Sequence, residues 1–116
     1  MILLLVYYRM FDENGPLRVN APIYTNNSYI GRVDANDIPP PHNVSSLAGR
    51  ICYMEGRVFS LDENGWKGYV TEVFKTISSP EALNLGERLS LLSADRPGSR
   101  PQEPVVVKSV KCPSIP

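Results

Sequence analysis

The 116-residue sequence lacks an excess of either charge, because 12 lysines and arginines balance 12 aspartates and glutamates. It also lacks any run of basic residues. A net positive field is what draws proteins to nucleic acid and to anionic membranes. We therefore expect no nucleic acid and no membrane among the partners of this chain. Its hydrophobic content of 42% is ordinary for a globular domain, and its length suits a single core.

Histidine and cysteine are equally scarce. The single histidine, His42, follows three prolines, and the two cysteines, Cys52 and Cys112, are far from Cys-x-x-Cys spacing. Structural zinc sites need four such ligands, and acid–base catalysis needs a base with positioned partners. The sequence contains no G-x-G-x-x-G fingerprint and no P-loop. We expect no cofactor, no metal and no enzymatic activity. The cysteines form a disulfide, or they are one buried residue and one free thiol; the spacing leaves both alternatives open.

The longest apolar run, at residues 1–11, is too short to span a membrane. No basic segment precedes it, and two tyrosines and an arginine stand where a secretory signal would have small residues. Its unbroken apolar character predicts a central strand that is buried on both faces. We expect a cytoplasmic protein. Secretion stays an alternative, since Asn26 and Asn43 both begin glycosylation patterns.

The chain is organised around residues 38–56, where one short amphipathic helix is predicted. Three prolines end the preceding extended segment, and Asn43 is suited to cap the first helical turn through its side-chain oxygen. Gly56 suits the positive φ found at many helix ends. We predict a helix at about 43–55 that packs on a sheet, because it is too short to persist alone. Apolar residues recur in it at steps of three and four, namely Val44, Leu47, Ala48, Ile51 and Met54.

Strands and turns make up the rest of the predicted fold. Asn-Gly pairs at 14–15 and 64–65, together with the Asn-Asn-Ser sequence at 26–28, indicate turns. A serine followed by a proline is typical of a helix start, so one helical turn is predicted at 78–83. Further strands are predicted at 17–24, 29–35, 57–61, 66–77, 89–92 and 105–110.

This order of elements predicts a single α+β domain over residues 1–111 with a tail at 112–116. One main helix on a mixed sheet, in this order, resembles the β-grasp, or ubiquitin-like, arrangement. Residues 44–56, VSSLAGRICYMEG, resemble the helix of ubiquitin-like proteins, in which apolar residues at this spacing precede an acidic residue and a glycine. Conjugated members of that family end in Gly-Gly, which this sequence lacks. The resemblance thus implies a β-grasp fold, no role as a conjugated modifier and no particular partner.

A second resemblance is to an uncharacterised domain that recurs in mushroom-forming fungi. It extends to the later segment at 89–104, and it implies no established chemistry. The pattern that carries it, GR-x-D … IPPPH-x-V-x-SL … I … EG, comprises Gly31, Arg32, Asp34, residues 38–42, Val44, Ser46, Leu47, Ile51, Glu55 and Gly56.

Two groups of residues are candidates for binding. Arg96 and Arg100 flank a Pro-Gly-Ser sequence in a polar loop, where their guanidinium groups would suit an acidic or extended peptide. Trp66 and Tyr69 belong either to the core or to an exposed patch. We expect a non-catalytic protein–protein interaction or scaffold module, with strand addition or self-association at a sheet edge as a route to its partner. The alternative is a small secreted lectin-like or immunomodulatory protein that uses its aromatic residues against a sugar or a cell surface.

Overall fold

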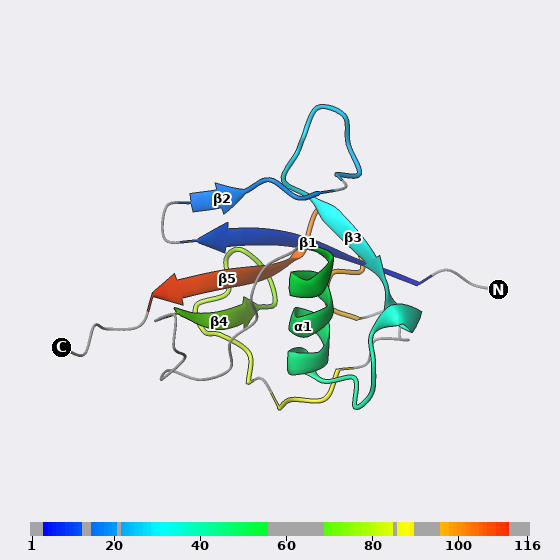
Figure 1. The fold of residues 1–116 in the computed structure, drawn as a ribbon, viewed down its shortest axis with the longest axis vertical. Helices are drawn as coiled ribbons and strands as arrows, with labels where there is room; N and C mark the ends of the chain where they lie inside the picture. The colour runs from blue at the N-terminus through cyan, green and yellow to red at the C-terminus, as the bar shows by residue number, and fades with distance from the viewer. Residues whose placement is uncertain are drawn as a thin grey trace.

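The computed structural model describes residues 4–12, 15–20, 22–55, 69–84, 86–89 and 96–111, with the backbone alone for 69–71 and 109–111. Within these ranges the chain forms a mixed α+β fold (Figure 1). Its strands are β1 (Leu5–Asp12), β2 (Gly15–Leu17), β3 (Gly31–Asp34), β4 (Tyr69–Phe74) and β5 (Val105–Lys111). Its helices are the 3-10 helix η1 (Ala35–Asp37) and the α-helix α1 (Val44–Met54). No helix in the described part is long and apolar enough to cross a membrane.

The central strand of the sheet is β1. It runs parallel to β5 on one side, where Tyr8 lies opposite Val105, and antiparallel to β2 and β3 on the other. β3 pairs with the first half of β1 and β2 with its end, so these two short strands share one edge (Figure 1). β4 pairs antiparallel with β5 on the far side. The described residues thus form one α-helix and a mixed five-stranded sheet, which is compatible with a β-grasp.

The prediction that the first strand is buried on both faces is wrong. Burial alternates along β1: Val6, Tyr8 and Met10 are buried, and the residues between them are half-buried. The buried set belongs to the face of the sheet that α1 covers (Figure 1). The sequence conceals the alternation because outward positions such as Leu5 and Tyr7 are also apolar or aromatic.

The core lies between α1 and this inner face, as the helix pattern predicts. The predicted cap is confirmed, because Asn43 Oδ1 accepts hydrogen bonds from the Ser46 N–H at 2.8 Å and from the Ser46 hydroxyl at 2.9 Å. The apolar stripe of the helix faces the sheet, with Val44, Leu47, Ala48 and Ile51 fully buried. Their buried neighbours in the strands include Val6, Tyr8, Val33, Val73, Val105 and Val107.

The helical turn predicted at 78–83 is wrong. The Ser79 hydroxyl oxygen accepts a hydrogen bond from the Thr76 N–H at 3.1 Å, so this serine closes the turn before it instead of starting a helix after it. Leu83 then donates its backbone N–H to the carbonyl of Val73 at 2.7 Å and packs against the core. These tertiary contacts outweigh the local helix-start signal.

The remaining predicted strands have mixed outcomes. Those at 1–11, 29–35, 66–77 and 105–110 are confirmed where the structure describes them, with bounds that differ by a few residues. The strand at 17–24 is wrong beyond Leu17, where β2 ends and a loop begins. The strand at 57–61, the turn at 62–65 and all but the first residue of the strand at 89–92 lie outside the described residues.

Candidate functional site

The loop at 96–103, which contains both predicted arginines, is bound to the backbone of β1. Arg96 Nε donates a hydrogen bond to the Leu5 carbonyl at 2.8 Å, and the Tyr7 N–H donates to the Gly98 carbonyl at 2.7 Å. Gly98 is buried at a φ of +69°, and a Cβ there would lie 2.5 Å from the carbonyl oxygen of Tyr7. Glycine tolerates both this positive φ and the close contact between the loop backbone and β1. The glycine at position 98 therefore lets the loop lie directly against the sheet.

A pocket of about 360 Å³ lies between this loop and the turn that follows β4. We call it the basic pocket. Lys75 and Thr76 contribute one wall because β4, which ends at Phe74, delivers them next to the loop. The other wall comes from the loop itself, namely Arg96, Pro97, Gly98, Ser99, Arg100 and Glu103.

Among the described residues, three cationic side chains and one carboxylate line the basic pocket. Lys75 and Arg100 are exposed, and Arg96 is half-buried. Arg100 forms an ion pair with Glu103, and their side chains are 69% and 53% exposed. An exposed pair of this kind contributes at most about 1 kcal/mol, because water and salt screen it. The described lining of the pocket thus brings three cationic side chains together in a chain whose formal net charge is zero.

This arrangement suits an anion. Guanidinium and ammonium groups donate charge-assisted hydrogen bonds to carboxylate or phosphate oxygens. The described residues that line the pocket include two hydroxyl side chains, Thr76 and Ser99. Among the described residues, no group of three His, Cys, Asp or Glu side chains lies close enough to hold a metal ion.

Sequence reasoning locates part of this pocket. Arg96 and Arg100 line it together, as the loop hypothesis requires. Lys75 was missed, because nothing in the sequence links it to a loop about 20 residues further on; the pairing of β4 with β5 brings the two together. Tyr69 begins β4, where its backbone alone is described, and Trp66 lies outside the described residues.

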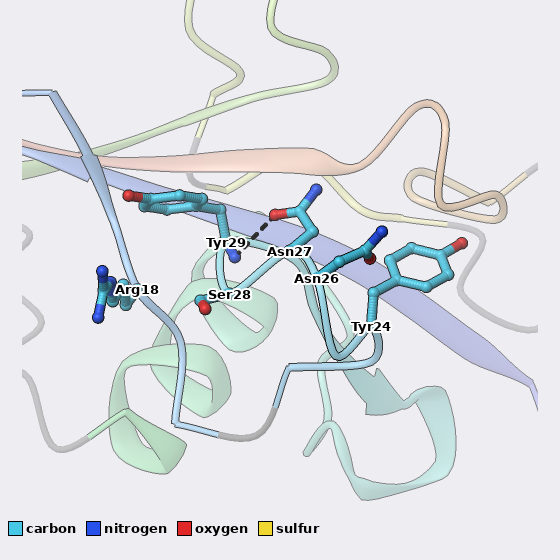
Figure 2. Close-up of a pocket in the computed structure, with 6 residues that line it drawn as sticks. All are labelled: Arg18, Tyr24, Asn26, Asn27, Ser28 and Tyr29. Carbon is cyan, nitrogen blue, oxygen red and sulfur yellow. Dashed lines mark hydrogen bonds between the residues drawn. The ribbon is translucent and has the colours of Figure 1, made fainter.

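A second pocket lies in the long loop between β2 and β3, which extends away from the sheet (Figure 1). It is wide and open, at about 790 Å³. We call it the tyrosine pocket. In Figure 2 the rings of Tyr24 and Tyr29 lie at opposite ends of it, with two asparagine side chains between them. Its lining residues are Arg18, Tyr24, Asn26, Asn27, Ser28 and Tyr29.

The turn predicted at 26–28 shapes the tyrosine pocket. Asn27 Oδ1 accepts a hydrogen bond from the Tyr29 N–H at 3.0 Å, the bond drawn in Figure 2. The Ser28 carbonyl accepts from the Val19 N–H at 2.8 Å, which ties the two arms of the loop together. Tyr24 remains 42% exposed. The loop therefore presents an aromatic ring and side-chain amides to solvent from a hydrogen-bonded frame.

A buried polar cluster lies at the end of α1. The Tyr8 hydroxyl donates to Glu55 Oε2 at 2.7 Å, and the Asn20 N–H donates to Glu55 Oε1 at 2.9 Å. Burial, the hydrogen bond to Glu55 and the negative charge of that carboxylate all raise the pKa of Tyr8 above its usual value. Glu55 is 9% exposed and Tyr8 is 1% exposed. The cluster joins helix, sheet and loop, and we assign it a structural role.

Comparison of the chain with models of protein families, with curated proteins and with solved structures finds no match. The function must therefore be inferred from the pockets and their chemistry.

Proposed function

We propose that this chain is a non-catalytic protein–protein interaction module that binds an acidic segment of a partner protein at the basic pocket. The observation that carries the proposal is the convergence of Lys75, Arg96 and Arg100 on one pocket of an otherwise charge-balanced chain. Complementary charge of this kind steers association and fixes the register of a bound segment. The hydrogen bonds that hold the loop to β1 support the same reading, because a preformed loop loses less entropy on binding.

For the fold, we propose the β-grasp arrangement of ubiquitin-like proteins. Three features support it: the parallel neighbours β1 and β5, the antiparallel β1–β2 pair, and the helix between the first strands and β4. We further propose that the module acts in the cytoplasm. In this proposal the module recognises its partners non-covalently.

The basic pocket supports partner binding better than the edges of the sheet do. At the β4 edge the Val73 carbonyl already accepts the N–H of Leu83, so an added strand would lose that bond. At the other edge β2 is only three residues long and includes Pro16, which has no N–H to offer. Strand addition and self-association remain proposals that sedimentation of the purified chain would test.

The test of the proposed function is affinity capture from a lysate of the source cells. Arg96 should be left unchanged, because its bond to Leu5 holds the loop in place. Lys75→Ala and Arg100→Ala remove two pocket charges from exposed side chains, and Arg32→Ala is the matched control on β3, exposed and outside both pockets. We expect a protein that the wild type and Arg32→Ala recover and that the double variant loses. Equal recovery by all three baits would show that the pocket is not the binding surface.

The tyrosine pocket favours a second candidate function, the recognition of a sugar by a secreted protein. The exposed ring of Tyr24 and the half-buried ring of Tyr29, with nearby amides and an arginine, suit the apolar faces and hydroxyls of a saccharide. A glycan array probed with the wild type and with Tyr24→Ala tests it, with Tyr53→Ala as control because Tyr53 is 77% exposed on α1. Binding that is lost in the first variant and kept in the second is the supporting result.

A further inference from the structure

We propose that the tyrosine pocket binds an oligosaccharide that carries a carboxylate group, and that Arg18 recognises the acid. The inference rests on the second candidate function, sugar recognition at this pocket, and names the class of sugar. Three observations support it: the charge of Arg18, the hydrogen-bond donors that line the pocket, and the bonds that hold the loop in shape.

Arg18 is held at the pocket by the residues on either side of it. Leu17 ends β2 and packs against the core. Val19 is buried, and its N–H donates to the Ser28 carbonyl at 2.8 Å. With both neighbours fixed, the exposed side chain of Arg18 lines the pocket at the end where Figure 2 shows the ring of Tyr29.

The charge of Arg18 has no counter-charge within the described part of the chain. Among the described residues its guanidinium has no ion-pair or hydrogen-bond partner, and none of those that line the pocket carries a carboxylate. A carboxylate can accept two parallel hydrogen bonds from a guanidinium and compensate its charge, whereas a neutral sugar hydroxyl leaves that charge in place. A sugar with a carboxylate therefore suits this pocket better than a neutral one.

The asparagine side chains of the loop add further donors. Asn27 Oδ1 accepts the hydrogen bond from the Tyr29 N–H at 3.0 Å, so the NH2 end of this amide is the one that remains to donate to a ligand. Asn26 is exposed and lines the same pocket. The exposed ring of Tyr24 offers a flat surface to the apolar face of a sugar ring. The lining thus matches a ligand that has many acceptor oxygens and an apolar face.

The loop that carries the pocket is fixed by hydrogen bonds before any ligand binds. The Ile23 N–H donates to the Ile30 carbonyl at 3.1 Å. At the end of α1, Asn20 donates its backbone N–H to Glu55 Oε1 at 2.9 Å and its side-chain amide to the Met54 carbonyl at 3.1 Å. A preformed pocket loses less entropy on binding, so contacts with a sugar are not offset by the ordering of this loop.

The size of the pocket indicates a ligand longer than a monosaccharide. The pocket measures about 790 Å³, and pockets of about 300–1,000 Å³ hold drug-sized ligands. Figure 2 places Arg18 and Tyr24 at opposite ends of it. An acidic sugar unit at Arg18 and a second unit against the Tyr24 ring would occupy both ends. We therefore expect oligosaccharides to bind better than single sugars.

The experiment is a titration of the full chain at neutral pH, followed by its backbone amide resonances. The chain is produced in bacteria, so that Asn26 carries no glycan. The probes are sialyllactose, a galacturonate trisaccharide and a hyaluronan tetrasaccharide, each paired with its carboxyl-reduced counterpart, in which an alcohol replaces every carboxylate. We expect saturable shifts at Asn27, Ser28 and Tyr29. At least one acidic probe should bind about three- to tenfold tighter than its counterpart, the range expected for one charge-assisted contact at an exposed arginine.

Variants assign the preference for the acid to Arg18. Arg18→Ala should abolish the preference and leave the affinity for the carboxyl-reduced counterpart unchanged, because only the acid pairs with the guanidinium. Arg18→Lys keeps the charge and loses the planar fork, so it should keep part of the preference. Tyr24→Ala should weaken both members of a pair by the same factor. Arg32→Ala is the matched control and should bind as the wild type does, since Arg32 is exposed on β3 and lies outside both pockets.

Three results would overturn the inference: equal affinity for both members of every pair, a preference for the acid that persists in Arg18→Ala, or acetate that binds as tightly as the acidic oligosaccharides. Carboxyl-reduced probes that bind through Tyr24, without any preference for the acid, would refute the acidic sugar and leave sugar recognition standing. A lack of binding by all of these probes would refute sugar recognition at this pocket as well. Neither outcome affects the interaction module, which the capture experiment tests at the basic pocket.

Discussion

The buried hydrogen bond from Tyr8 to Glu55 makes a testable prediction about stability at alkaline pH. The substitution Tyr8→Phe keeps the ring in the core and removes only the hydroxyl. Glu55 then keeps the hydrogen bond from the Asn20 N–H and loses the one from the Tyr8 hydroxyl. A hydrogen bond to a charged group contributes about 1.5–3 kcal/mol, so we expect the variant to be about 2 kcal/mol less stable at pH 8.

This difference should shrink above pH 10. An exposed tyrosine releases its proton near pH 10, as Tyr8 does in the unfolded chain, whereas its raised pKa keeps the proton on in the folded state. The folded state then binds more protons than the unfolded state, and the free energy of unfolding falls by up to about 1.4 kcal/mol per pH unit. Phenylalanine has no proton to release, so the variant escapes this loss. The difference in the free energy of unfolding between the wild type and Tyr8→Phe, which we call the gap, should narrow from about 2 kcal/mol at pH 8 to about 0.6 kcal/mol at pH 11.

Urea unfolding followed by circular dichroism between pH 8 and pH 11 measures the gap. At pH 8 the midpoints should differ by about 1–2 M, given the usual dependence of stability on urea. Tyr53→Phe is the control, because Tyr53 is 77% exposed and should show almost no gap at any pH. A Tyr8→Phe gap that stays constant from pH 8 to pH 11 would refute the reasoning, since it would mean that Tyr8 ionises alike in the folded and unfolded chains.

Three further substitutions test local features of the fold. Asn43→Ala removes the helix cap and should lower the free energy of unfolding by about 1 kcal/mol in urea titrations, with no change in Asn43→Asp. Gly31→Ala places a Cβ 2.6 Å from the Tyr8 ring and should lower the free energy of unfolding by about 1–3 kcal/mol. An unchanged melting temperature would contradict this contact. Gly98→Ala places a Cβ against the Tyr7 carbonyl at a φ of +69° and should lower the free energy of unfolding by about 2 kcal/mol. Amide resonances should change mainly in the 96–103 loop, and unchanged resonances there would contradict the contact between this loop and β1.

Local signals in the sequence were sufficient to predict α1. The Asn43 cap and the apolar residues at steps of three and four all lie within a dozen positions, and the helix forms where they place it. The strands β1 and β5 were also predictable from their apolar and β-branched content, and β3 from the alternation of residues over 29–35. Ser79 shows the limit of such signals. A serine before a proline fits a helix start, but here its hydroxyl accepts a bond from an N–H three residues earlier.

Contacts between distant residues account for what the sequence could not predict. Glu55 meets Tyr8, 47 residues away, and Asn20, 35 residues away, and no spacing rule links such residues. The candidate site likewise has one part that the sequence predicts and one part that only the folded structure reveals. The two loop arginines were predictable as neighbours in the sequence, whereas Lys75 joins them only through the pairing of β4 with β5.

The position of β1 explains how so small a domain holds a preformed pocket. Its inner face anchors the end of α1 through Tyr8, while the backbone of Leu5 and Tyr7 holds the 96–103 loop. One strand thus fixes both the core and the pocket. Ordering a mobile side chain on binding costs about 0.5–1.5 kcal/mol. The hydrogen bond from Arg96 to the Leu5 carbonyl already orders that side chain in the folded protein, so its share of the cost on binding is smaller. Substitutions that disturb β1 should therefore weaken ligand binding and stability together, whereas changes at Lys75, Arg100 and Glu103 should alter binding alone.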